Sequence, residues 1–112
     1  MQITSTKEGD FYIIKIYGDV DVSSSLTLDK NIQKAMNEGE KYILIEGTNL
    51  NYISSAGLGV FMSYLQDFKD NKIYFSIYAL NEKVKDVFQI LGLDQLISIV
   101  ETSEEAKENA YK

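Results

Sequence analysis

The sequence predicts a single α/β domain over residues 1–112, with a mostly parallel, mixed sheet and helices packed on it. Short runs rich in β-branched and aromatic residues alternate with longer segments whose apolar residues recur at helical spacing. One run, at 42–45, is apolar throughout, as in a strand covered on both faces. The length of 112 residues suits one domain. The predicted order β-β-α-β-α-β-α-β-α gives parallel strands joined by right-handed crossovers.

Strands are predicted by runs of β-branched and aromatic residues, and loops by polar segments. Helices are predicted by apolar residues at helical spacing, with Gly39 and Gly92 ending the first and the third, and the last helix by the capping-box spacing of Thr102 and Glu105. In the third helix, Val84, Val87, Phe88 and Leu91 are expected to share one packed face. The polar tail at 102–112 is expected to fray at its end. The predicted elements are strands at 3–6 and 11–17, a loop at 18–21, a helix at 23–38, a strand at 41–46, a loop at 49–53, a helix at 55–70, a strand at 73–79, a helix between Asn81 and Gly92, a strand at 96–100 and a short helix opening at Thr102.

Composition excludes several classes of function. The chain carries 11 basic and 17 acidic side chains, a net charge of −6, which argues against binding nucleic acid or an anionic membrane surface. It has no cysteine and no histidine, so a Ser–His–Asp triad, a thiol nucleophile and a zinc–thiolate site are excluded. We therefore expect neither an enzyme nor a cofactor. The polar N-terminus and the short apolar runs predict a cytoplasmic protein with no direct membrane insertion.

Two segments are candidates for the functional site, because ligands of parallel sheets gather where strands end and helices begin. These segments are 18–25 and 49–59. The second places Ser54 and Ser55 at the start of a predicted helix, followed by Ala56, Gly57 and Gly59. A serine there can cap the helix, lie beside an anion or accept a phosphoryl group, and capping is the commonest of the three. The segment lacks the lysine of a phosphate-binding loop.

The segment also contains two glycines at positions where glycine is unfavourable. Glycine inside a helix costs about 1 kcal/mol relative to alanine. Gly57 and Gly59 both fall near the start of the predicted helix. They indicate a close approach there, either by the core or by a partner.

The string Tyr52–Val60, with sequence Tyr-Ile-Ser-Ser-Ala-Gly-Leu-Gly-Val, resembles the signature of the STAS domains, the anti-sigma factor antagonists. Three further fragments resemble the family in the same order along the chain, so the resemblance covers nearly its whole length. They are Tyr17–Asp21, Tyr42–Ile45 and Ile90–Leu93.

The resemblance implies a partner switch. Regulatory members bind an anti-sigma factor that is a serine kinase, and this binding releases the sigma factor. The kinase then phosphorylates one serine of the antagonist, which dissociates until a metal-dependent serine phosphatase restores it. By its position in the signature that serine is Ser55. Ser54 stands where well-known regulatory members carry aspartate, and it is a second, competing acceptor.

We expect the partner surface to combine both candidate segments with the first turns of the second helix. Asp19 and Asp21 have an alternative interpretation as turn residues and an N-cap, and Leu58 as a core residue. The expected surface is Asp19, Asp21, Tyr52, Ser54, Ser55, Ala56, Gly57, Leu58 and Met62.

Two other functions stay open at this point. The first is a STAS module without a phosphorylation cycle, such as a scaffold or an accessory subunit of a lipid-transport ATPase. The second is an enzyme, such as a serine hydrolase or a nucleotide-hydrolysing protein. The absence of a histidine base and of a phosphate-loop lysine argues against it. The oligomeric state is also open, because a sheet edge could pair two copies.

Overall fold

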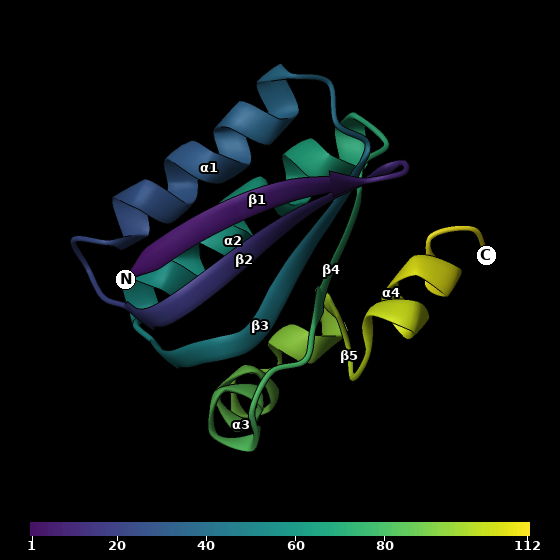
Figure 1. The fold of residues 1–112 in the computed structure, drawn as a ribbon. Coiled ribbons are helices and arrows are strands. Elements are labelled where there is room, and N and C mark those ends of the chain that lie inside the picture. The colour runs from purple at the N-terminus through teal and green to yellow at the C-terminus, as the bar shows by residue number, and fades with distance from the viewer.

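A mixed five-stranded sheet runs through the protein in the order β1-β2-β3-β4-β5. The computed structural model describes residues 1–112 (Figure 1). β1 pairs with β2 in an antiparallel manner and all other neighbours are parallel, which confirms the predicted fold class. The elements are β1 Gln2–Glu8, β2 Phe11–Val20, α1 Ser25–Asn37, β3 Tyr42–Ile53, α2 Ser55–Asp70, β4 Tyr74–Tyr78, α3 Glu82–Ile90, the 3₁₀ turn η1 Leu93–Gln95, β5 Ser98–Val100 and α4 Ser103–Asn109.

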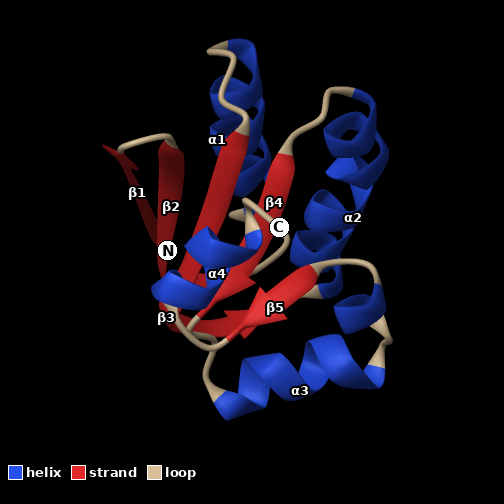
Figure 2. Ribbon diagram, turned by 90° about the vertical axis from the view of Figure 1, so that its right-hand side faces the viewer, coloured by secondary structure: helices blue, strands red, loops and turns tan.

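The main core lies between the sheet and α1, α2 and α3. Alternate residues of β2 and β3, among them Ile14 and Ile45, point into it and are fully buried. The helices contribute their apolar stripes, with Ile32 from α1, Phe61 from α2 and Phe88 from α3 at its centre. α1 and α2 lie on one side of the sheet and α4 on the other (Figure 2).

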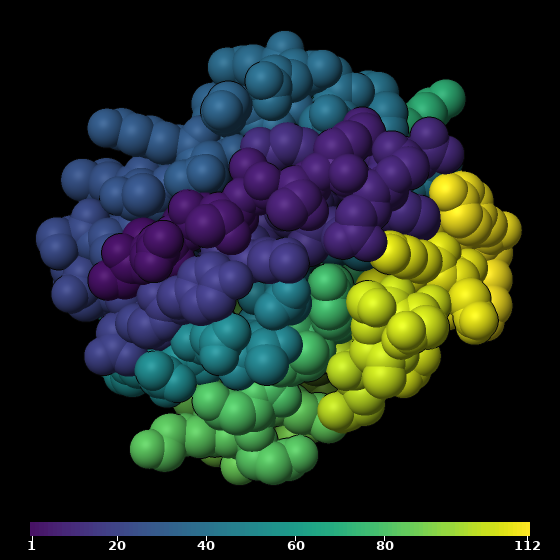
Figure 3. Space-filling model, in the orientation of Figure 1, coloured from purple at the N-terminus to yellow at the C-terminus, as the bar shows by residue number.

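A smaller core occupies the opposite face, under α4. The Tyr74 hydroxyl donates to the Ala106 carbonyl at 2.7 Å, and the Lys107 ammonium pairs with the Glu8 carboxylate at 3.0 Å. The Tyr111 ring lies edge-on to Phe11, with ring centroids 5.8 Å apart. The C-terminal segment therefore lies against the β1–β2 hairpin (Figure 3). The short helix predicted to open at Thr102 is confirmed as α4, with Thr102 as its N-cap.

The structure corrects two predicted loops. The loop expected at 49–53 is wrong: these residues are the second half of β3, which runs for 12 residues. Likewise, β2 continues to Val20 through the segment predicted as a loop. The pairing explains why residues 47–53 are largely polar. β4 pairs with β3 only as far as Glu46, and beyond it β3 pairs with β2 alone, so this half of β3 is less covered. Along this outer half, Leu50 and Ile53 are buried while their polar neighbours face solvent.

Other differences are smaller. The predicted strand at 96–100 shrinks to Ser98–Val100, because η1 ends at Gln95 and Leu96 and Ile97 form the turn that follows it. α3 ends at Ile90, and the chain then turns at Gly92 with φ 73°. Leu91 is consequently 58% exposed, so its predicted place on the packed face of α3 is wrong.

None of the helices combines the length and the apolarity needed to span a membrane.

Candidate functional site

The two segments singled out in the sequence meet at one end of the sheet. Asp19 pairs with Tyr52, and Val20 pairs with Ile53, across the last positions of β2 and β3. One residue later, the Ser54 amide donates to the Val20 carbonyl at 2.8 Å. The end of β2 and the start of α2 are therefore held side by side.

The two serines have different environments. Ser54 is the N-cap of α2, with extended backbone angles (φ −80°, ψ 169°), and its Oγ accepts a hydrogen bond from the Gly57 amide at 3.2 Å. This bond satisfies one of the backbone amides that are left unpaired at the helix end. The Ser54 side chain is also buried. Ser55 is the first residue of α2 and is exposed. It lies where the partial positive charge of the helix end favours an anion.

The two glycines of α2 also differ. A Cβ on Gly57 would lie 2.7 Å from Ile53 Cγ1 and 2.8 Å from Val20 Cγ1, so this position needs glycine for close packing against β2 and β3. A Cβ on Gly59 would meet nothing within 4 Å. The predicted close approach is thus to the core at Gly57, while Gly59 is open to solvent.

A groove of about 300 Å³ begins at Ser55 and runs between α2 and the segment that follows α3. Leu58 and Leu93 are buried in its floor. Met62 and Leu91, which are 44% and 58% exposed, form its rims. Sequence reasoning missed Leu91, Leu93 and Gly59 as lining residues. Ile90 and Leu91, the two apolar residues before the turn at Gly92, could have indicated this groove, since the exposed face of a surface helix is usually polar.

The β2–α1 turn is fixed by Asp21. Its Oδ1 accepts hydrogen bonds from the Ser24 amide at 2.8 Å and from the hydroxyls of Ser23 and Ser24 at 2.9 Å each. These bonds, the one from the Ser24 amide first, lower the pKa of Asp21 to about 2. Asp21 is thus a turn residue, as one interpretation held, but the N-cap of α1 is Ser24.

The structure divides the nine predicted surface residues by exposure. Asp19, Asp21, Tyr52, Ser55 and Met62 are exposed, and Ala56 is half-buried. Ser54, Gly57 and Leu58 are buried, so they shape this surface from beneath and present little side chain to a partner.

A family model for the STAS domain matches residues 2–106. The chain belongs to the STAS domain family. The resemblance found in the sequence is thereby confirmed. One similar protein is an anti-sigma-B factor antagonist of Staphylococcus aureus, which is 27% identical over 104 residues, covering 93% of this chain and 96% of the relative.

Two solved structures share the fold. An anti-sigma factor antagonist from Mycobacterium paratuberculosis has a TM-score of 0.89 at 14% identity, over 99% of this chain and 94% of the other. The Bacillus cell fate determinant SpoIIAA in its phosphorylated form has a TM-score of 0.72 at 18% identity, over 96% and 98% of the two chains.

Proposed function

We propose that this STAS protein is an anti-sigma factor antagonist. It binds an anti-sigma factor serine kinase through the sheet end that carries Ser55, and phosphorylation of Ser55 ends the binding. A serine phosphatase restores the active form. One observation carries the proposal: an exposed hydroxyl lies at the start of α2, directly beside an apolar groove. The names of the staphylococcal relatives support the same function.

The unmodified surface offers apolar area to a partner. Met62 and Leu91 on the groove rims, together with Tyr52 at the end of β3, are large side chains that are about half exposed. Burying a fully exposed side chain of this kind contributes roughly 1.5–3 kcal/mol, so each of these half-exposed side chains would contribute about half as much. Because Ser55 lines the same groove, a partner seated there covers its hydroxyl.

Phosphorylation would reverse this balance. A phosphate adds about −1.5 to −2 charges at neutral pH. Docking would then have to strip water from that charge in an interface that also faces Asp19 and Asp21. A penalty of about 4 kcal/mol would weaken binding roughly a thousandfold. The fold itself tolerates the phosphate, because the helix N-terminus favours an anion.

The geometry favours Ser55 over Ser54 as the acceptor. Phosphorylating Ser54 would break its cap bond to the Gly57 amide and place a dianion in a buried position. Both changes would destabilise α2, whereas Ser55 is accessible to a kinase without unfolding. The switch therefore works by excluding the partner at the surface and leaves the fold intact.

The test measures binding by calorimetry to the anti-sigma factor kinase of the native host. We expect Ser55→Asp to weaken binding at least a hundredfold and Ser55→Ala to bind normally while resisting inactivation by ATP. Ser63→Asp is the matched control, because Ser63 is an exposed serine of the same helix outside the groove.

Tandem mass spectrometry after kinase treatment should place one phosphate on Ser55. Unchanged affinity of Ser55→Asp, or phosphate on Ser54, would contradict the proposal. Stable capture of a transporter subunit with no effect of Ser55→Asp would instead support the STAS module without a phosphorylation cycle.

A further inference from the structure

A second, separate cavity lies at the far end of α2 from Ser55. Its volume is about 380 Å³, and it opens between the last two turns of α2, the start of β4 and the segment before β5. Lys69 lies 14 residues after Ser55, about 20 Å along the helix axis. This cavity is distinct from the proposed partner surface, so a ligand could bind in it whether or not Ser55 is a phosphorylation site.

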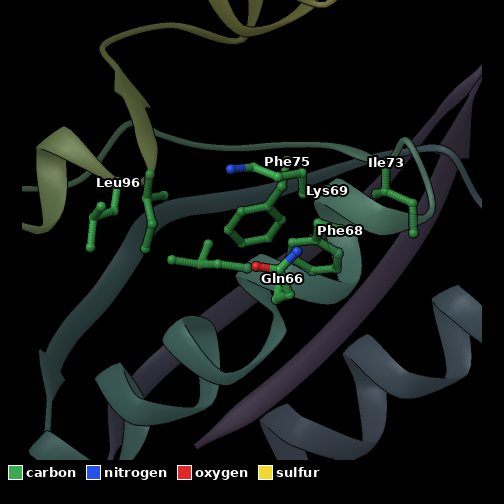
Figure 4. A pocket seen from close by; sticks show the side chains of 8 residues that line it. Gln66, Phe68, Lys69, Ile73, Phe75 and Leu96 are labelled. Carbon is green, nitrogen blue, oxygen red and sulfur yellow. The ribbon is translucent and has the colours of Figure 1, made fainter.

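The interior of this cavity is apolar. Phe68 and Phe75 stack on each other with ring centroids 4.8 Å apart, and both are largely buried. Ile73 and Ile97 continue the wall, and Leu96, which is 60% exposed, lies on the opposite rim. Figure 4 shows the two phenyl rings side by side, with Leu96 across the opening. Such a surface suits an alkyl chain or an aromatic ring.

The rim carries one cationic side chain. Lys69 is exposed and takes no part in the four ion pairs of the structure. In Figure 4 its ammonium extends past Phe75 toward the side where Leu96 lies. None of the eight lining residues is acidic, although the chain holds 17 carboxylate side chains. The other polar lining group, the Gln66 amide, donates to Asp70 at 2.9 Å, and Asp70 is outside the lining.

From this arrangement we propose that the cavity binds a small amphipathic anion, namely a single-chain or single-ring organic carboxylate. The apolar tail lies against Phe68 and Phe75, and the carboxylate pairs with the Lys69 ammonium. A volume of about 380 Å³ is near the lower end for ligand sites, which favours one short chain over a two-chain lipid. Charge complementarity sets the head group, because Lys69 is the only ionic group of the lining.

The test compares three probes with one tail and different head groups: octanoate, 1-octanol and octylammonium. Each is titrated into the ¹⁵N-labelled protein while backbone amide shifts are recorded. We expect saturable shifts at the amides of Phe68, Lys69, Phe75 and Ile97, and binding of octanoate about three- to tenfold tighter than octylammonium. Equal affinity for the three head groups, or no saturable shift, would overturn the proposal.

Two variants and a control locate the site. Lys69→Glu should invert the preference between octanoate and octylammonium. Lys34→Glu makes the same charge reversal in the last turn of α1 and should leave the preference unchanged. Leu96→Ala removes an exposed side chain, so the fold is kept, and should weaken all three probes about threefold or more. An equal effect of Lys34→Glu and Lys69→Glu would refute the site, because only the net charge would then matter.

Discussion

Replacing each of the two glycines of α2 by alanine tests how tightly this helix packs on the sheet. At Gly57 the new methyl group would lie 2.7 Å from Ile53 Cγ1 and 2.8 Å from Val20 Cγ1. Both neighbours are buried, and valine and isoleucine are stiff at χ1, so neither can yield easily. Overpacking of this kind costs about 1–3 kcal/mol. At Gly59 the same methyl group meets nothing within 4 Å.

Both substitutions gain about the same helix propensity, roughly 1 kcal/mol, so the difference between them isolates the clash. We expect Gly59→Ala to be more stable than the parent protein by about 0.5–1 kcal/mol. Gly57→Ala should be less stable than Gly59→Ala by about 1–3 kcal/mol.

Urea unfolding followed by circular dichroism measures this, and the midpoints of the two variants should differ by roughly 1 M if the slopes are equal. If the two alanine variants unfolded at the same midpoint, the close contact of α2 with Val20 and Ile53 would be wrong.

Three further predictions concern stability. Ser54→Ala should cost about 1 kcal/mol because it removes the cap, whereas Ser55→Ala should change the free energy of unfolding by less than about 0.5 kcal/mol; equal losses in urea unfolding would contradict the assigned roles. The pKa of Asp21 is lowered to about 2 in the folded state, below an unfolded value of about 3.9, so its stabilising effect is present above about pH 4 and is lost as pH falls toward 2. The difference in urea midpoint between the parent and Asp21→Ala should therefore shrink as the pH falls from about 4 toward 2. A difference that stays constant with pH would contradict the lowered pKa of Asp21. Tyr64→Phe should cost about 1–2 kcal/mol, because the Tyr64 hydroxyl donates to the Asp29 carboxylate at 2.5 Å and joins α2 to α1; a thermal melt identical to that of the parent would exclude a stabilising role for this bond.

Periodicity in the sequence predicted the order of the elements but not the full length of β2 and β3. Beyond Tyr17 of β2 and Glu46 of β3, the two strands pair only with each other. Asn49 and Asn51 face solvent there and make this stretch look like a loop. The pairing of β2 with β3 also shifts register twice, between Lys15 and Tyr17 and between Gly18 and Asp19. These shifts interrupt the two-residue alternation of buried and exposed side chains on which strand prediction depends. Such irregular pairing is decided by contacts between strands, which no local pattern records.

The candidate site was predictable where one short segment supplies it. The serine pair and the glycines lie within one helix start, and only their difference in burial needed the structure. Leu91 and Leu93 come from a segment more than 30 residues away, and their place beside Ser55 depends on how α3 crosses back to α2. The place of Lys69 at the rim of the second cavity could not be predicted from the sequence either. Lys69 has the position of a common polar residue of an amphipathic helix, and only the fold brings Phe75 and Leu96 near it.

The placement of the two termini affects how a reporter should be attached. Met1 lies against Gly18, whose added Cβ would be 3.6 Å from the Met1 Cα, and the next residue along β2 is Asp19. Lys112 emerges beyond α4, on the far side of the sheet and away from the start of α2 (Figure 1). A fluorescent protein or affinity handle fused before Met1 would therefore crowd the surface where a kinase is expected to dock. The same fusion after Lys112 would leave that surface accessible.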